Sequence, residues 1–418
     1  MRLSSGHLAR LCLTNMAIGG LTALPINLFN RLMAVELGLL ATLPGLLVAL
    51  HYGVQLTRPV WGHRSDAKGG RTPFILGGIA LIGLGLIGTA WAIAVVQSGP
   101  LALAVWVLAY IAIGLGVGAA GTSFLALLAT ASPEGQKGAW ATAAWLALIF
   151  GAIVASIGTG IALDPYAPDK LIPVVSAVSL IGLILAFVAT WGIERNLTAT
   201  AETTNTESLR EALRTTMADP AARGFTGFVF LSILAFFLSE MVLEPFAGHV
   251  HGLPPEDSTK LSGGKDGAAL LGMLLAGGLS TLGFGSLRSW AIAGCAISAV
   301  GLVGLALQGP LVAFTVIMGL GNGLFVVGAV GSMMRLAAAE KRSTGTRMGV
   351  FGAAQAVAAG LASLISTATV DVGRVALPIE AAYASVFFIE AGLFVAAAFL
   401  AMRLLSAQAP QPQLQPGE

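Results

Sequence analysis

The sequence predicts an all-helical polytopic membrane protein with twelve transmembrane helices in two six-helix halves. Three observations support this fold class. The 418 residues are 56% hydrophobic and only 10% charged, with a mean hydropathy of +0.86, whereas soluble globular proteins carry about 25% charged residues. Apolar stretches long enough to cross a bilayer recur along the chain, and motifs of the first half return in the second half. The composition therefore excludes an ordinary soluble protein and a disordered one.

The twelve spans follow from the length of the apolar stretches, since a membrane-crossing helix needs about 20 mostly apolar residues. Six such stretches precede the longest polar segment of the chain, and six follow it. The expected spans are 11–37, 39–60, 73–96, 100–131, 139–163 and 171–193 in the first half, and 224–248, 266–286, 290–308, 310–337, 348–370 and 381–403 in the second half.

The Lys and Arg residues predict the orientation in the membrane. With the amino terminus inside, most of the 22 fall in cytoplasmic loops, Arg31 falls within the first span, and four fall outside: Lys170, Lys260, Lys265 and Arg374. Basic residues of membrane proteins concentrate in the cytoplasmic loops. Both termini are therefore predicted to be cytoplasmic.

The polar segment between spans six and seven predicts the domain boundaries. It begins Thr-rich and then carries Leu209 and Leu213 at helical spacing, which favours a flexible linker followed by a short amphipathic helix at the membrane surface. The predicted parts are a first six-helix half at 1–193, a cytoplasmic linker at 194–223, a second six-helix half at 224–403 and a disordered cytoplasmic tail at 404–418.

The two halves repeat one another in detail. Gly114-Leu-Gly-Val-Gly118 in span four matches Gly319-Leu-Gly-Asn-Gly323 in span ten, and both spans lead into a charged loop. Two pseudo-symmetric six-helix halves, with a site near the midplane between them, are the architecture of the major facilitator fold, which this sequence resembles. The glycine runs also have a purely structural interpretation, as close-packing surfaces between helices.

A second motif lies between spans two and three, where Gly62-His-Arg-Ser-Asp66 is followed by Arg71. Major facilitator proteins carry a Gly-x-x-x-Asp plus Arg pattern at this place, in which the Asp meets a helix amino end and the Arg braces the inner gate. A carboxylate does favour the positive end of a helix dipole. Gly62, Asp66 and Arg71 are thus the candidate cytoplasmic gate motif, and a charged cytoplasmic turn is the alternative.

Further segments, taken together, resemble one branch of that superfamily. They are Asn30-Arg-Leu-Met-Ala-Val-Glu-Leu-Gly38, Ala49-Leu-His-Tyr52, Arg58-Pro59, Arg71-Thr-Pro73, Leu243-Glu-Pro245, Gly319-Leu-Gly-Asn-Gly-Leu324 and Phe351-Gly-Ala-Ala-Gln-Ala356. This combination is similar to the PucC family, the bacteriochlorophyll-delivery group, from about Leu11 to Arg403. One departure is Ser239-Glu240, where the family often has Gln-Asp before the Leu-Glu-Pro element.

The resemblance implies the function and its surroundings. It implies an integral membrane assembly factor in the cytoplasmic or intracytoplasmic membrane of a photosynthetic bacterium, surrounded by membrane lipid. Such a protein binds or delivers (bacterio)chlorophyll and assists the assembly of light-harvesting antenna complexes. The expected cargo is then (bacterio)chlorophyll, and the expected partners are antenna polypeptides and pigment-synthesis enzymes. The net charge of only +2, without a basic block, indicates no nucleic-acid partner.

Ionisable and polar residues at membrane depth are the candidates for a cavity site, because such groups are costly in hydrocarbon. Asn27 and Arg31 in span one have the same spacing as Glu240 and Glu244 in span seven, and Glu390 lies in span twelve. We expect Arg31 and Glu244 to pair across the pseudo-twofold axis, in a site for pigment or for a proton. The alternative is ion pairs that only hold the helices together.

Among the histidines, His51 alone lies well inside a span. A neutral imidazole can serve as an axial ligand of the chlorophyll magnesium, and a hydrogen-bonded packing residue is the alternative. His249 and His251 at the outer end of span seven make only a weak metal site without a carboxylate partner. We therefore predict no metal site.

No catalytic constellation is recognisable, since the chain has no phosphate-binding P-loop, no His-Glu-x-x-His and no nucleophile elbow. We therefore predict that the protein is not an enzyme. A proton-coupled transporter of a small or amphiphilic solute is the main alternative, because Glu240, Glu244 and Glu390 are of the type used in proton relays. A structural partner in antenna assembly that binds no pigment is a third possibility.

Overall fold

The computed structural model describes residues 4–67, 70–133, 136–194, 220–338 and 344–404. These residues form helices and turns, and none of the described residues lies in a strand. Ten helices in this part of the chain are long and apolar enough to cross a membrane. The chain is therefore an integral membrane protein, and its prediction as all-helical is confirmed for the described residues.

Two of the twelve expected spans fall on helices outside these ten. The expected span 39–60 is divided between α3 (Thr42–Val54), a 3-10 turn (Gln55–Thr57) and α4 (Arg58–Ala67). The expected span 266–286 corresponds to α12 (Pro255–Thr281), which begins well before the apolar stretch and carries charged residues in its first half. The number of twelve spans stays a prediction.

The contacts within the chain define two compact units, and each is described by itself. Unit 1 comprises Met1–Asn205, Phe237–Gly267 and Ala359–Val386, and unit 2 comprises Thr206–Phe236, Ala268–Ala358 and Phe387–Glu418. Unit 1 therefore contains parts of second-half helices together with the first half. The division into the sequence halves 1–193 and 224–403 stays a prediction. Most of the expected linker and tail, at 195–219 and 405–418, lies outside the described residues.

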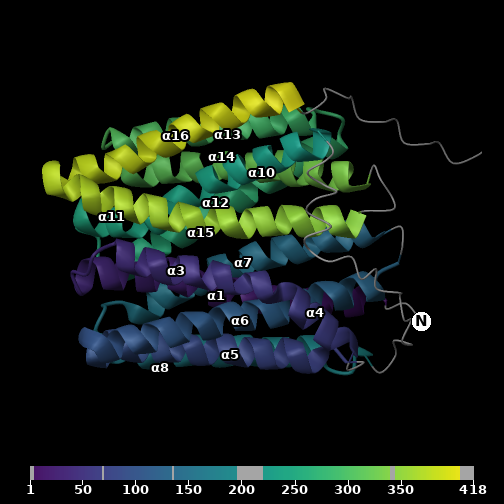
Figure 1. The fold of residues 1–418 in the computed structure, drawn as a ribbon, viewed down its shortest axis with the longest axis horizontal. Helices are drawn as coiled ribbons and strands as arrows, with labels where there is room; N and C mark the ends of the chain where they lie inside the picture. The colour runs from purple at the N-terminus through teal and green to yellow at the C-terminus, as the bar shows by residue number, and fades with distance from the viewer. Residues whose placement is uncertain (1–3, 68–69, 134–135, 195–219, 339–343, 405–418) are drawn as a thin grey trace, which may run out of the picture. The chain divides into compact units, whose positions relative to one another are not determined.

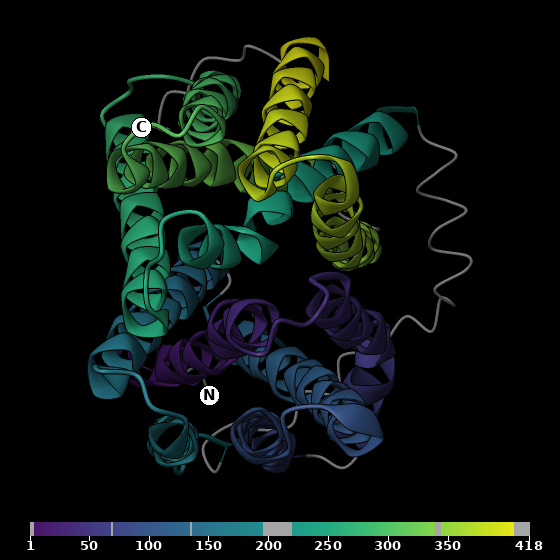
Figure 2. The same ribbon diagram turned by 90° about the vertical axis from the view of Figure 1, so that its left-hand side faces the viewer.

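Unit 1 is built from long apolar helices that run side by side (Figure 1) and appear nearly end-on in Figure 2. Glycines allow the closest approaches: an added Cβ at Gly78 would overlap the α6 backbone, and one at Gly19 would overlap the α7 backbone. The long helices of the first half are α1 (Ser5–Ile26), α5 (Thr72–Trp91), α6 (Gly99–Ala131), α7 (Lys137–Leu163) and α8 (Pro168–Thr190).

In unit 2, α13 (Leu287–Ala306) packs closely against α14 (Leu311–Ala338). An added Cβ at Gly294 would overlap the backbone of Phe325, and one at Gly301 would overlap that of Met318. The unit also holds most of α10 (Pro220–Leu238) and parts of α12, α15 (Thr344–Ala376) and α16 (Ile379–Leu404).

The glycine runs of spans four and ten contact matching helices in their own units. Gly116 approaches α5, the third span, and Gly321 approaches α13, its counterpart in the second half. Gly118 approaches Trp61 of α4, and Gly323 approaches the α12 backbone. Their interpretation as close-packing surfaces is therefore confirmed. The matching contacts add a structural observation to the sequence repeat.

Candidate functional site

The first span is interrupted where its polar residues lie. Pro25 inside α1 has no N–H to continue the helical hydrogen bonds, and the chain turns at Asn27 before α2 (Leu28–Arg31) and a π-helical turn (Leu32–Glu36). The buried Tyr110 of α6 donates its hydroxyl to the carbonyl oxygen of Pro25 over 3.1 Å. The break is thus supported by a side chain from another helix.

The seventh span is interrupted in the same way. A 3-10 turn (Ser239–Met241) separates α10 from α11 (Leu243–His249). In a continuous helix the carbonyl of Met241 would accept from residue 245, but Pro245 has no N–H. Asn30, fully buried on α2, donates its Nδ2 to this carbonyl over 2.5 Å. Asn30 thus satisfies the group that Pro245 leaves open.

These two breaks hold four of the candidate residues. Asn27 and Arg31 lie at the first, Glu240 and Glu244 lie at the second, and α2 packs against α11 within unit 1. Interrupted membrane helices expose backbone and side-chain polar groups at membrane depth, which is where transporter folds bind their substrates. The breaks therefore form the polar centre of unit 1.

Arg31 has a different partner from the one expected. Its Nη1 lies 2.9 Å from Oε1 of Glu36, and its Nη2 donates to the carbonyl of Leu253 over 2.7 Å. The guanidinium passes over Gly248, where an added Cβ would overlap it. The predicted pair between Arg31 and Glu244 is therefore wrong. The π-helical turn, with its i→i+5 hydrogen bonds, directly follows Arg31 and ends at Glu36, which it places within reach of the guanidinium.

The Arg31–Glu36 pair lies near the α7–α8 loop, where Tyr166 is located. Burial raises the pKa of Tyr166 to about 12, and the negative charge of Glu36 acts in the same direction, while Arg31 opposes it. Glu36 itself is 38% exposed. The pair thus joins the buried guanidinium of Arg31 to a partly exposed carboxylate.

Glu240 is paired with a lysine that the sequence placed in an outer loop. Lys265 lies on α12, is almost fully buried, and its Nζ forms ion pairs with Glu240 and, over 3.3 Å, with Asp266. The assignment of Lys265 to a loop is therefore wrong, because α12 begins at Pro255. The burial of this ammonium group depends on its two carboxylate partners.

Glu244 has no such partner. It is 1% exposed, and its Oε2 accepts from the Thr259 hydroxyl over 3.2 Å. Its Oε1 has no hydrogen-bond partner among the described residues. The carboxyl group is thus buried among hydroxyl groups instead of cations.

His51 is buried in α3 and belongs to a chain of polar side chains. Its Nε2 lies 2.8 Å from Nε2 of Gln55, whose Oε1 accepts from Arg58. With the amide oriented in this way, His51 accepts at Nε2 and carries its proton on Nδ1. Nδ1 has no partner among the described residues. This geometry favours the packing interpretation, and the axial-ligand role stays a prediction.

Glu390 is fully buried on α16 and belongs to unit 2, whereas the other candidate cavity residues belong to unit 1. At the end of α11, His249 Nδ1 lies 2.8 Å from the hydroxyl of Tyr383 on α16. Burial lowers the pKa of His251, in the turn after α11. Among the described residues, no group of three or more His, Cys, Asp or Glu side chains is placed to hold a metal ion.

The candidate gate motif is only partly described. Gly62 and Asp66 lie in α4, and the side chain of Asp66 falls outside the described groups. Arg71 donates from Nη1 to the carbonyl of Ala126 and to the Thr130 hydroxyl, over 2.8 and 2.5 Å. It therefore joins the start of α5 to α6 within unit 1.

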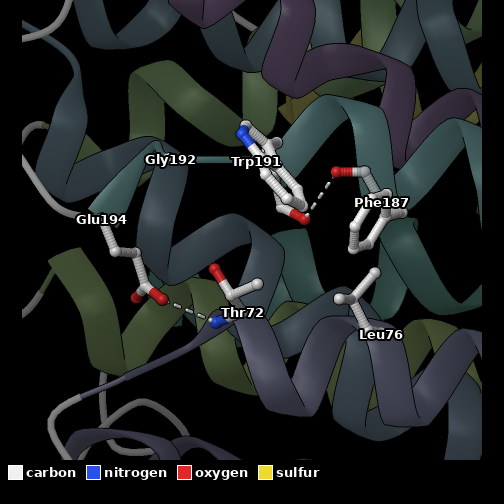
Figure 3. A pocket seen from close by; sticks show the side chains of 7 residues that line it. Thr72, Leu76, Phe187, Trp191, Gly192 and Glu194 are labelled. Carbon is white, nitrogen blue, oxygen red and sulfur yellow. Dashed lines mark hydrogen bonds between the residues drawn. The ribbon is translucent and has the colours of Figure 1, made fainter.

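A carboxylate that the sequence did not single out lies at the amino end of α5. Glu194 accepts from the backbone N–H groups of Arg71 and Thr72, over 2.6 and 2.9 Å. Glu194 thus makes the type of contact that we expected of Asp66. Figure 3 shows Glu194 and Thr72 at one side of a cavity of about 210 Å³, with Phe187 and Trp191 at the other.

Two further carboxylates were missed because their partners lie far away in the chain. Asp371 of α15 accepts from the N–H groups of Ala41 and Thr42 at the start of α3, over 3.0 and 2.7 Å. Asp164, at the end of α7, binds Lys260 of α12 over 2.9 Å. Hydrogen bonds to Asp164 and Asp257 raise the pKa of Lys260. In both cases the end of one helix is joined to the start of another.

The contacts of Asp371 predict a moderate loss of stability when they are removed. Asp371→Ala leaves the first N–H groups of α3 without an acceptor, and losing a helix cap of this kind lowers stability by about 1 kcal/mol. Thermal unfolding of the purified protein in detergent measures the change. Asp169→Ala, in the exposed first turn of α8, is the matched control. An equal effect of both substitutions would contradict the capping role.

Comparison with known proteins identifies the family to which the chain is similar. The family model described as PUCC protein matches residues 28–409. The chain is 44% identical over 419 residues to the bacteriochlorophyll synthase 44.5 kDa chain of Rhodobacter capsulatus, covering 98% of both chains. It is 29% identical to protein PucC of Cereibacter sphaeroides, covering 95% of this chain and 92% of that protein. A protein PucC of Rhodobacter capsulatus is 27% identical, over 96% and 92% of the two chains.

The match extends over nearly all of the spans and includes the break in span seven and most of the polar residues described above, and it begins at Leu28, directly after the turn in span one. The resemblance of the sequence motifs to this family is thereby confirmed. This chain belongs to the PucC family.

Proposed function

We propose that this protein is a membrane assembly factor that binds or delivers (bacterio)chlorophyll and assists the assembly of light-harvesting antenna complexes in a photosynthetic bacterium. The observation that carries the proposal is membership of the PucC family over residues 28–409. The 44% identical relative, named as a chain of bacteriochlorophyll synthase, supports a connection with this pigment. The proposed partners are antenna polypeptides and pigment-synthesis enzymes.

The proposed fold is the major facilitator fold, with twelve spans in two halves and both termini in the cytoplasm. The sequence repeat supports it, as do the matching glycine contacts of Gly116 with α5 and Gly321 with α13. In this fold α3 with α4, and α12, are the second and eighth spans. Gly62, Asp66 and Arg71 are then proposed as the cytoplasmic gate.

The polar groups at the helix breaks are proposed to meet the cargo, together with His51 and Glu390. Arg31 Nε and His51 Nδ1 are buried donors with no hydrogen-bond partner among the described residues, and the ring carbonyls of a bacteriochlorophyll are hydrogen-bond acceptors. Coordination of the magnesium by Nε2 of His51 would first require the Gln55 amide to move away, because it binds that atom. Hydrogen bonding to the cargo thus fits this conformation better than metal ligation.

The protein is proposed to act without catalysing a chemical step. The name of the 44% identical relative connects that protein with a synthase. A deletion strain distinguishes a role in pigment synthesis from a role in antenna assembly. A deletion strain that accumulates free bacteriochlorophyll while losing its antenna absorption bands supports the assembly role. A strain that stops making the pigment, or one that keeps normal antenna bands, contradicts it.

Purification in mild detergent separates the remaining alternatives. An absorption band of bacteriochlorophyll in the purified protein supports pigment binding. Antenna polypeptides without pigment would instead indicate a purely structural partner. A colourless protein that acidifies reconstituted vesicles on addition of a solute would indicate a proton-coupled transporter, and would overturn the proposal.

A further inference from the structure

Glu244 is a buried acid whose polar surroundings differ from those of the other carboxyl groups of the site. It is placed at the start of α11, against α2 and α12. Thr259 donates to Oε2, the hydroxyl of Ser262 also faces the carboxyl, and Oε1 has no partner among the described residues. Hydroxyl groups are thus its hydrogen-bonding neighbours, and they do not neutralise a negative charge.

The cations near Glu244 are engaged by other carboxylates. Arg31 binds Glu36 over 2.9 Å, and Lys265 binds Glu240 and Asp266. The ionisable groups that face Glu244 or its helix are Arg31 of α2, Glu36 of the π-helical turn, Glu240 of the 3-10 turn, Lys265 and Asp266 of α12, and His249 of α11 with Tyr383 of α16 and Arg374 of α15. Arg31 and Lys265 are the cations that act on Glu244, and both are already paired, so an ionised Glu244 would add a negative charge without a cation of its own.

A buried carboxyl group without a paired cation takes up a proton, because the charged form loses its hydration. We propose that Glu244 is a proton-binding site, occupied by a proton while α11 and α12 are packed together. The proton lies on Oε1, since Oε2 accepts from Thr259. The proposal rests on the burial of Glu244 and on the pairing of its neighbours. It does not depend on whether the protein binds pigment.

Infrared spectroscopy of the purified full-length protein tests the proton directly. A protonated carboxyl has a carbonyl stretching band that carboxylates and amides lack. We expect this band at neutral pH in the wild type and a weaker band in Glu244→Gln, whose amide has nearly the same shape. Glu240→Gln is the matched control, because Glu240 is paired with Lys265 and its replacement removes no such band. An unchanged band in Glu244→Gln would overturn the proposal.

A second measurement follows stability against pH. The folded protein holds a proton at Glu244 that an unfolded chain releases near the ordinary pKa of about 4.3, so stability falls as pH rises. We expect the unfolding midpoint of the wild type to fall as the pH rises above about 4.3, and this fall to be smaller in Glu244→Gln. Equal pH profiles for the two proteins would contradict a proton at this site. Each protein is compared with itself across pH. A general loss of stability in the variant therefore does not produce a smaller dependence of the unfolding midpoint on pH.

Discussion

Replacing Lys265 with methionine is expected to destabilise the protein more than any other single change in the polar centre of unit 1. The substitution keeps the length of the side chain and removes the ammonium group that Glu240 and Asp266 share. Breaking a buried ion pair from one side leaves an uncompensated charge and lowers stability by about 3–5 kcal/mol. The thermal unfolding midpoint in detergent and the amount of protein in the membrane both measure the loss.

Two further variants separate the contribution of the ion pair from the other effects of replacing a lysine. Lys260→Met also removes a lysine of α12, but Lys260 is partly exposed and pairs with exposed acids, so a small effect is expected. Adding Glu240→Gln to Lys265→Met removes one of the two carboxylates left unpaired, and should recover part of the stability. A double variant as unstable as the sum of the single variants would show that the two residues do not interact.

Substituting Gly151 with alanine is expected to have the second largest effect, because it inserts a methyl group where α7 touches α1. An added Cβ at Gly151 would overlap the carbonyl of Met16, and one at Gly19 would overlap that of Leu148. The contact is between two backbones, so no flexible side chain can give way. Overpacking of this kind lowers stability by about 1–3 kcal/mol.

Gly158 provides the control for this prediction on the same helix. It is exposed, and an added Cβ would meet nothing within 4 Å. Gly158→Ala should leave the unfolding midpoint unchanged or raise it slightly, because alanine favours the helix more than glycine does. A Gly151→Ala protein as stable as Gly158→Ala would show that the two helices are not in close contact there.

The positions of most spans could be predicted from the sequence, because burial in a bilayer selects long apolar stretches. The expected spans 100–131 and 139–163 agree closely with α6 and α7. The start of α12 could not be predicted in this way. Its first half carries acidic and basic residues that are typical of a loop, and they are accommodated in a helix by partners on other helices.

The sequence identified most residues of the candidate site, but it predicted few of the contacts between them. Asn27, Arg31, Glu240 and Glu244 were singled out because polar groups are rare in membrane spans, and the structure places them at two helix breaks. The partner of Arg31 was predicted wrongly, since the π-helical turn that presents Glu36 has no clear sequence signal. Glu194 and Asp371 were missed because each meets the amino end of a helix to which it does not belong.

The sequence by itself determined that this chain is a helical membrane protein of the PucC type with a repeated motif and a small set of polar residues inside its spans. These properties depend on composition and on local order along the chain. The tertiary structure decided which charges pair, and therefore that Glu244 has no cation of its own. Pairing depends on distances of a few ångströms between residues far apart in sequence, such as Lys265 and Glu240. For that reason the unpaired acid at Glu244 becomes visible only in the folded protein.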